Sequence, residues 1–159
     1  HLQSYGFDVA GWSQNKKQLP GVSSYAGAEE LEGFLKRTDA LCCLLPLTAD
    51  TQGILNRHNM SQLPKGSIVI NAGRGQHLVV DDLLELLDEN HLRGAVIDVF
   101  EQEPLPKEHQ LWQHPKVMMT PHSSAQSEYP PCVEKIGNTL QAIIDNKNPS
   151  GLVDRCKGY

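Results

Sequence analysis

The sequence lacks the features that mark several classes of protein. None of its apolar runs approaches the roughly 20 residues that cross a bilayer, and no positively charged start followed by an apolar stretch resembles a signal peptide. It contains no internal repeat, and its 39% hydrophobic and 21% charged residues exclude collagen-like, coiled-coil and fully disordered chains. We therefore expect its 159 residues to amount to one soluble domain, located in the cytoplasm, with no membrane partner.

Basic residues are also scarce. The chain has 14 Lys and Arg against 19 Asp and Glu, which gives a formal net charge of −5 with its 7 His neutral. This balance provides no basic field to hold a nucleic acid backbone. We expect no nucleic acid partner.

Only four cysteines occur, at positions 42, 43, 132 and 156. Cys42 and Cys43 are neighbours in an apolar run, and no C-x-x-C or Cys/His pair has the spacing of metal ligands. We expect free, mostly buried thiols rather than a disulfide or a metal site.

Short β-rich runs alternate with helical patterns along the chain. The runs cover residues 7–12, 22–26, 40–46, 67–73, 94–100 and 117–122, and the helical patterns cover 28–36, 80–92 and about 127–146. This alternation is typical of an α/β fold with a parallel sheet. Three runs, ALCCLL, SIVIN and AVIDVF, are apolar at consecutive positions, which predicts strands covered on both faces. Ligands bind at the carboxyl ends of such strands, so the residues just after each run are the site candidates.

Three of these junctions carry residues suited to acid–base chemistry. Arg74 lies between two glycines in NAGRGQ and offers a bidentate fork to a carboxylate or phosphate. Asp98 lies near the end of the next run and Glu103 lies just beyond it, and His122 ends the last run. Taken singly, Arg74 could be a surface residue in a tight turn, the acids could be structural, and His122 could be a half-buried histidine bonded to backbone. Together an arginine, an acidic side chain and a histidine suit reduction of a 2-keto acid. Arg74 would bind the substrate carboxylate, and protonated His122, paired with an acidic side chain, would be the acid.

The motifs LLPLTADTQGILN, INAGRGQHLVVDDLLELLDENHLRGAVIDVFEQEPLP and LWQHPKVMMTPHSSA, in this order, resemble those of the D-isomer-specific 2-hydroxyacid dehydrogenases. Within that family, WSQNKK, LWQHP and VDRCKGY are most similar to the glyoxylate/hydroxypyruvate reductase A branch, which uses NADPH. The resemblance implies a Rossmann-type doubly wound parallel sheet and a small 2-keto acid, glyoxylate or hydroxypyruvate, as substrate. It implies that Arg74, Glu103 and His122 are catalytic and that the full-length protein is a homodimer. It also implies cofactor contacts from Asp98, on the nicotinamide carboxamide, and from the lining residues Leu45, Pro46, Ala72 and Gly73.

The loop after the first run bears on the choice of cofactor. In a dinucleotide fold an acidic residue here favours NAD, whereas a basic or neutral loop tolerates the 2′-phosphate of NADP. Residues 13–17 read SQNKK, with no Asp or Glu. We predict NADP (NADPH) over NAD, with Ser13, Gln14 and Lys16 nearest the phosphate, although Lys16 also fits a plain solvated surface position.

One family feature is missing. No G-x-G-x-x-G occurs in the sequence, so the turn that anchors the pyrophosphate and the central first strand are not found. We therefore expect an incomplete sheet, in which the runs at 7–12 and 40–46 each lack a neighbour on one side, and a partial sequence or cleavage product. We expect residues 1–125 to be a partial dinucleotide-binding domain and residues 126–159 a C-terminal helix and tail that packs back toward a substrate domain. Two alternatives to a reductase stay open: a noncatalytic dehydrogenase-like binding or regulatory protein, and an inactive fragment of the enzyme.

Overall fold

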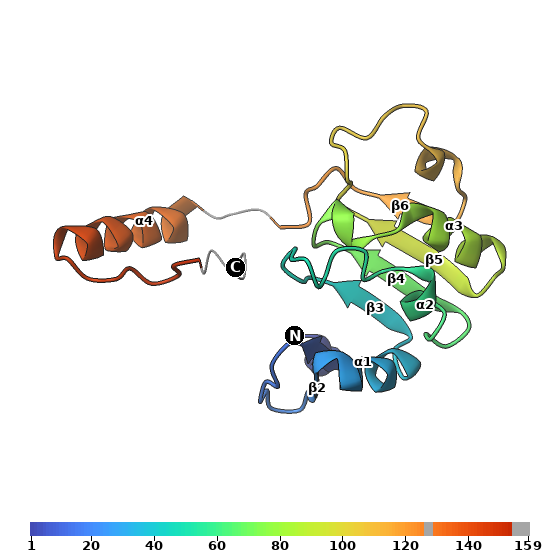
Figure 1. Ribbon diagram of the computed structural model, residues 1–159, viewed down its shortest axis with the longest axis horizontal. Coiled ribbons are helices and arrows are strands. Elements are labelled where there is room, and N and C mark those ends of the chain that lie inside the picture. The colour runs from blue at the N-terminus through green and yellow to red at the C-terminus, as the bar shows by residue number, and fades with distance from the viewer. Residues whose placement is uncertain (126–128, 154–159) are drawn as a thin grey trace. The chain divides into compact units, whose positions relative to one another are not determined.

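A computed structural model describes residues 1–125 and 129–153. These residues form two compact units, His1–Pro121 and His122–Tyr159, drawn in Figure 1. In chain order the elements are η1 (Leu2–Tyr5), β1 (Ala10–Ser13), β2 (Ser23–Ala26), α1 (Gly27–Lys36), β3 (Ala40–Cys43), α2 (Arg57–Met60), β4 (Ser67–Asn71), η2 (Gly75–His77), α3 (Val80–Asp88), β5 (Leu92–Ile97), η3 (Gln110–Gln113), β6 (Val117–Met119) and α4 (Tyr129–Ile144). Each of the six predicted runs contains or overlaps a strand, which confirms the α/β prediction.

The strands form two separate parallel sheets. One has the order β3-β4-β5-β6 and the other pairs β1 with β2. Among the described residues, β1 and β3 are not paired with each other. The expectation of an incomplete sheet, with each of these strands lacking a neighbour on one side, is therefore confirmed.

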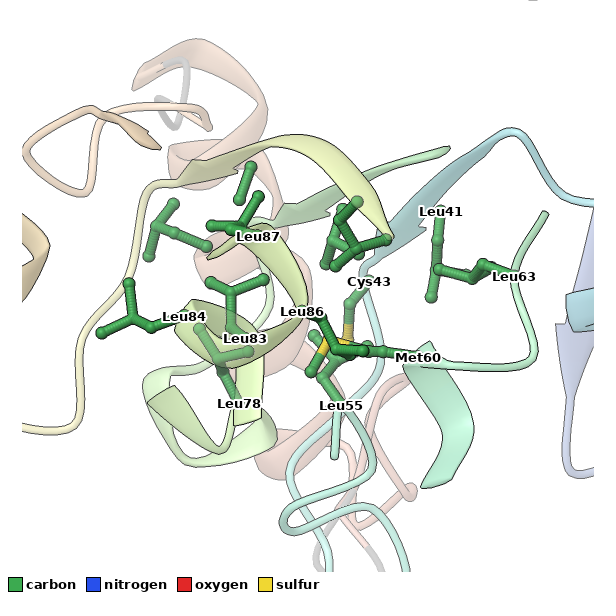
Figure 2. Packing of buried hydrophobic residues seen from close by; sticks show 14 of the residues in the cluster. Leu41, Cys43, Leu55, Met60, Leu63, Leu78, Leu83, Leu84, Leu86 and Leu87 are labelled. Atoms are coloured by element: carbon green, nitrogen blue, oxygen red, sulfur yellow. The ribbon is translucent and has the colours of Figure 1, made fainter. Parts of the chain in front are cut away.

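The register of the four-stranded sheet builds its buried face. Leu41, Val69 and Ala95 are paired across three strands, and so are Cys43, Asn71 and Ile97. All six are buried. Figure 2 shows Leu41 and Cys43 together with leucines of α3 and with Met60 of α2. One face of α3 packs into this core, because Leu83, Leu84, Leu86 and Leu87 are all buried.

The prediction that the apolar strands are covered on both faces is wrong for β3. Its burial alternates, so that Leu41 and Cys43 are buried while Ala40 and Cys42 are exposed. The side chains that alternate with the buried ones in β4, Ile68 and Ile70, are half-buried. Neighbouring residues of a strand point to opposite faces, and only one face of this sheet contacts the leucine cluster. The expectation of mostly buried thiols fails for the same reason at Cys42; Cys132 is also exposed and Cys156 lies outside the described residues.

The helix predicted over 80–92 ends earlier, at Asp88. Asn90 adopts a left-handed backbone with φ of 57°, and the N–H of His91 donates to the carbonyl of Leu86 at 3.0 Å. This arrangement ends the helix through an asparagine in the left-handed conformation, a position where glycine is more usual. Leu92 consequently begins β5 instead of closing the helix.

The second unit consists mainly of α4. Pro130 and Pro131 lie in its first turn, and residue 127, near which the helical pattern was predicted to begin, lies outside the described residues. Five apolar side chains at helical spacing in α4 are each more than half exposed: Val133, Ile136, Leu140, Ile143 and Ile144. In the part of the chain that the structure describes, every helix is too short or too polar to span a bilayer.

Candidate functional site

The predicted site residues of the first unit follow the carboxyl ends of parallel strands. Leu45 and Pro46 follow β3, Ala72 to Arg74 follow β4, and Asp98 and Glu103 follow β5. Because these strands are neighbours in one parallel sheet, their ends lie along the same edge.

The loop that carries Arg74 is held by Asn71, whose side chain is fully buried. Its Oδ1 accepts the Gly73 N–H at 3.2 Å, and its Nδ2 donates to the Arg74 carbonyl at 3.0 Å. The Arg74 side chain itself is exposed, and its Nη1 donates to the Gly73 carbonyl at 2.8 Å. The guanidinium therefore starts from a fixed backbone and reaches toward solvent, where a ligand carboxylate could bind.

The glycines that flank Arg74 are required by the protein's own packing. A Cβ on Gly75 would lie 2.0 Å from the carbonyl carbon of Phe100, and a Cβ on Gly73 would lie 2.9 Å from Nδ1 of His77. Both distances are shorter than real contacts allow. The glycines therefore permit close approach of this backbone to Phe100 and His77. The contact at Gly75 brings the Arg74 loop against the segment that leads to Glu103.

Glu103 is exposed, and its Oε1 accepts the N–H of Phe100 at 3.0 Å. This bond orients the carboxylate at the start of the loop after β5.

Asp98 is only 3% exposed. One of its carboxylate oxygens accepts the hydroxyl of Thr120, at the end of β6, and its backbone N–H donates to the Asn71 carbonyl at 3.0 Å. A buried carboxylate at this edge can accept further hydrogen bonds, which suits recognition of an amide. The carboxamide contact stays a prediction.

His122 belongs to the second unit. Its backbone is left-handed, with φ of 50°, which is uncommon for a residue other than glycine and more typical of functional segments than of regular structure. Its predicted convergence with Arg74 and Glu103 stays a prediction.

The predicted phosphate loop after β1 lies beside α1. The hydroxyl of Ser13 donates to the Asn15 carbonyl at 2.7 Å. Gln14 and Lys16 are exposed, and Nζ of Lys16 lies 3.3 Å from a carboxylate oxygen of Glu30. The second oxygen of Glu30 accepts the Ala26 N–H at 2.6 Å, and these two contacts lower the pKa of the Glu30 carboxyl, the backbone bond first. Lys16 is therefore an exposed cation with a weak partner, and no acidic residue lies within 13–17.

Two buried polar residues that hold the site were missed by sequence reasoning. Asn71 was treated as part of an apolar run, and His77 was given no role. His77 is fully buried, accepts the Arg74 N–H at Nδ1 at 3.0 Å, and has Nε2 3.3 Å from the Pro46 carbonyl. The available signal was a polar residue inside an otherwise buried segment, since such a residue must find partners.

A cavity of about 340 Å³ lies behind the Arg74 loop. Gly75, Phe100 and Leu111 are among the residues that line it. None of the predicted site residues lines it, so it is separate from the proposed chemistry.

The residues present suit the two ends of NADP. Lys16 and the uncharged side chains of Ser13 and Gln14 are compatible with a 2′-phosphate, and buried Asp98 supplies an acceptor suited to a carboxamide. The sequence has no G-x-G-x-x-G turn for the pyrophosphate.

Comparison with known proteins identifies consistent relatives. Residues 1–124 match the family model for the NAD binding domain of D-isomer specific 2-hydroxyacid dehydrogenases. Glyoxylate/hydroxypyruvate reductase A of Salmonella paratyphi B is 46% identical over 158 residues, which cover 99% of this chain and 51% of that protein. The chain thus spans about half the length of the curated relatives it matches.

Solved structures show the same fold. An NADPH-dependent glyoxylate/hydroxypyruvate reductase from Sinorhizobium meliloti, in complex with NADP and sulfate, matches with a TM-score of 0.93 and 40% identity, covering 99% of this chain and 51% of that one. A D-isomer specific 2-hydroxyacid dehydrogenase from Xanthobacter autotrophicus, in complex with NADPH and MES, matches with a TM-score of 0.96 and 36% identity, covering 99% of this chain and 65% of that one. The predicted Rossmann-type fold is confirmed by these matches.

Proposed function

The chain belongs to the D-isomer-specific 2-hydroxyacid dehydrogenase family, and from this premise we propose that it contributes the catalytic and cofactor-binding residues of an NADPH-dependent reductase of glyoxylate or hydroxypyruvate. The observation that carries the proposal is the placement of Arg74 and Glu103 after neighbouring parallel strands, on loops in backbone contact at Gly75 and Phe100. The names of the similar proteins from Salmonella and Sinorhizobium support the choice of substrates.

Arg74 binds the substrate in this proposal. Its exposed guanidinium pairs with the keto acid carboxylate through two parallel N–H bonds and leaves further N–H donors to polarise the carbonyl. The fixed backbone around Asn71 keeps the fork at one position. This pre-organisation reduces the entropy lost when the substrate binds.

His122 and Glu103 form the acid–base pair. In reduction the protonated imidazole gives its proton to the carbonyl oxygen, and Glu103 accepts the other ring N–H, which fixes the ring and favours its protonated form. NADPH, when bound, supplies the hydride.

The remaining predicted residues hold the cofactor. Asp98 accepts the carboxamide, while Leu45, Pro46, Ala72 and Gly73 line the nicotinamide side. Ser13, Gln14 and Lys16 receive the 2′-phosphate. The absence of a carboxylate between residues 13 and 17 favours NADPH over NADH.

We extend the proposal to the setting of these residues. Residues 1–125 form part of a dinucleotide-binding domain, and residues 126–159 form a helix and tail that pack toward a substrate domain; positions 126–128 and 154–159 lie outside the described residues. The longer protein is a cytoplasmic homodimer whose partner molecules are the small acid and the cofactor.

The decisive experiment uses a hybrid in which this chain replaces the matching half of the Salmonella reductase, assayed beside the 159-residue chain alone. We expect the hybrid to oxidise NADPH when glyoxylate or hydroxypyruvate is added, with a lower KM for NADPH than for NADH. Arg74→Ala and His122→Ala lower turnover by roughly a hundredfold or more, while Lys107→Ala, an exposed residue outside the proposed site, leaves it unchanged. A folded hybrid that oxidises no NADPH with any keto acid would indicate a noncatalytic binding protein, and an active hybrid whose turnover neither substitution lowers would contradict the assigned roles of Arg74 and His122. Activity of the hybrid without activity of the chain alone would assign the chain as an inactive portion of the enzyme.

A further inference from the structure

The side chain of His77 is fully buried and uses both ring nitrogens. Nδ1 accepts the backbone N–H of Arg74 at 3.0 Å. A backbone N–H can only donate, so Nδ1 carries no proton and the neutral ring carries its proton on Nε2. Nε2 lies 3.3 Å from the Pro46 carbonyl, and in this tautomer it donates to that oxygen.

The ring is fixed in this position from several sides. The His77 carbonyl accepts the Leu55 N–H at 2.8 Å, and the His77 N–H donates to the Arg74 carbonyl at 3.1 Å. Gly73 lies so close to the ring that a Cβ there would be 2.9 Å from Nδ1. The imidazole therefore has little freedom to leave either partner.

The two bonds connect loops that follow different strands. Arg74 follows β4 and Pro46 follows β3. Asn71 holds the Arg74 loop from its β4 side, but His77 alone among the described side chains bonds both loops. Its ring thus links the two loops.

We propose that His77 is a positioning residue that, as the Nε2–H tautomer, holds the Arg74 loop at a fixed distance from the Leu45–Pro46 loop. This inference rests on the proposed function, in which Arg74 binds the keto acid and Pro46 lines the cofactor. His77 contacts no reacting atom. It acts through the Arg74 backbone, and so keeps the guanidinium that binds the substrate at a constant distance from Leu45 and Pro46, which line the nicotinamide side.

The first test is made on the 159-residue chain without substrate or cofactor. Two-bond proton–nitrogen correlation spectra of the imidazole report which nitrogen is protonated, and hydrogen exchange reports how firmly the Arg74 N–H is held. We expect the Nε2–H pattern at neutral pH and a protected Arg74 amide. The Nδ1–H pattern would overturn the proposal.

Three substitutions separate the two bonds. His77→Asn keeps an acceptor at the position of Nδ1, His77→Gln keeps a donor at the position of Nε2, and His77→Leu removes both. Exchange at Arg74, relative to the core amides of Val69 and Ile97, should rise about tenfold in the Leu and Gln variants and stay near wild type in the Asn variant. The Pro46 carbonyl carbon shift should be retained only in the Gln variant. Leu83→Ala, a core control, should change neither reading relative to the core amides.

The second test measures KM in the Salmonella hybrid. His77→Leu should raise the KM for glyoxylate about tenfold, whereas the KM of His77→Asn should stay close to that of the wild type. Equal exchange at Arg74 in the Leu and Asn variants, or an unchanged KM in an active hybrid, would overturn the proposal. If the Leu variant does not fold, the Asn and Gln variants decide by the same readings. Failure of the proposed function alone gives a different result: a hybrid inactive with every keto acid, while the tautomer and the Arg74 exchange behave as expected.

Discussion

The backbone of Gly75 lies directly against that of Phe100, so closely that a Cβ on Gly75 would stand 2.0 Å from the Phe100 carbonyl carbon and 2.2 Å from the Glu101 nitrogen. The neighbouring atoms are backbone and cannot swing aside. The contact fixes the spacing of the loops that carry Arg74 and Glu103, and it explains why a glycine follows the arginine.

Gly75→Ala should therefore destabilise the chain. Separating the two loops to admit a methyl group should lower the free energy of unfolding by about 2 kcal/mol or more. Urea denaturation followed by circular dichroism measures the change. Gly33→Ala, within α1, is the matched control. Its Cβ would lie 3.9 Å from the Tyr25 ring, an ordinary contact distance, and alanine stabilises a helix relative to glycine by about 0.5–1 kcal/mol. Equal stability of the two variants would contradict the close contact.

Asn71→Leu should also be costly. The substitution nearly preserves volume but removes the partners of the Gly73 N–H and the Arg74 carbonyl, and a buried group left unpaired costs about 1–3 kcal/mol. We expect a loss of about 3 kcal/mol in the free energy of unfolding, measured in urea. Asn59→Leu removes one bond, to the Ile54 carbonyl, from a half-buried position and should cost about 1 kcal/mol. A loss at position 71 no greater than that at position 59 would show that the Asn71 amide does not hold the loop.

The sequence predicted much of this fold, because strands and helices show characteristic periodic spacings of apolar residues. All four leucines of α3 are buried as their spacing indicates, and the six β-rich runs locate the strands. The end of α3 was missed because it depends on the left-handed backbone of Asn90, a local conformation that periodicity does not record. The open face of β3 was missed because an apolar run shows what could be buried, not what is present to cover it.

The site was only partly predictable for a related reason. Residue types at strand ends indicate candidate chemistry, so Arg74, Asp98 and Glu103 could be named from the sequence. The residues that hold them could not, since the roles of Asn71 and His77 follow from which backbone groups face them in three dimensions. A buried polar side chain in a sequence is a sign of such a role only after its burial is known.

The carboxyl of Glu30 should make stability depend on pH. Its bonds from the Ala26 N–H and from Lys16 lower its pKa in the folded state. Such a group stabilises the fold fully above its unfolded pKa of about 4.3, and this contribution is lost as the pH falls through the lower folded pKa. Urea midpoints should therefore be higher for the wild type than for Glu30→Gln near pH 7, and the gap should close in acid. Glu29→Gln removes a neighbouring charge but neither bond, so its difference in urea midpoint from the wild type should be smaller. A difference for Glu30→Gln that does not change with pH would contradict the prediction.

The cysteines should react with iodoacetamide in the order Cys132, Cys42, Cys43. Cys132 and Cys42 are exposed and Cys43 is buried, and burial raises the pKa of both the Cys42 and the Cys43 thiols. Alkylation requires the thiolate and access to it, so Cys43 should be labelled at least about tenfold more slowly than Cys132. Peptide mass spectrometry follows the three sites. In urea the rates should become similar, and rapid labelling of Cys43 in the native chain would refute its place beneath the sheet.

The hydroxyl of Thr120 should be needed at the end of β6, because it donates to the carboxylate of Asp98, which is 3% exposed. Thr120→Val preserves the shape but removes this donor from an acceptor that is nearly excluded from water. A charge-assisted bond contributes about 1.5–3 kcal/mol, so the free energy of unfolding should fall by about 2 kcal/mol. Thr120→Ser keeps the hydroxyl and should recover most of the loss, whereas equal losses in the two variants would attribute the effect to packing of the methyl group. In the Salmonella hybrid, Thr120→Val should also raise the KM for NADPH more than that for glyoxylate, because the bond orients the carboxylate that we assign to the carboxamide.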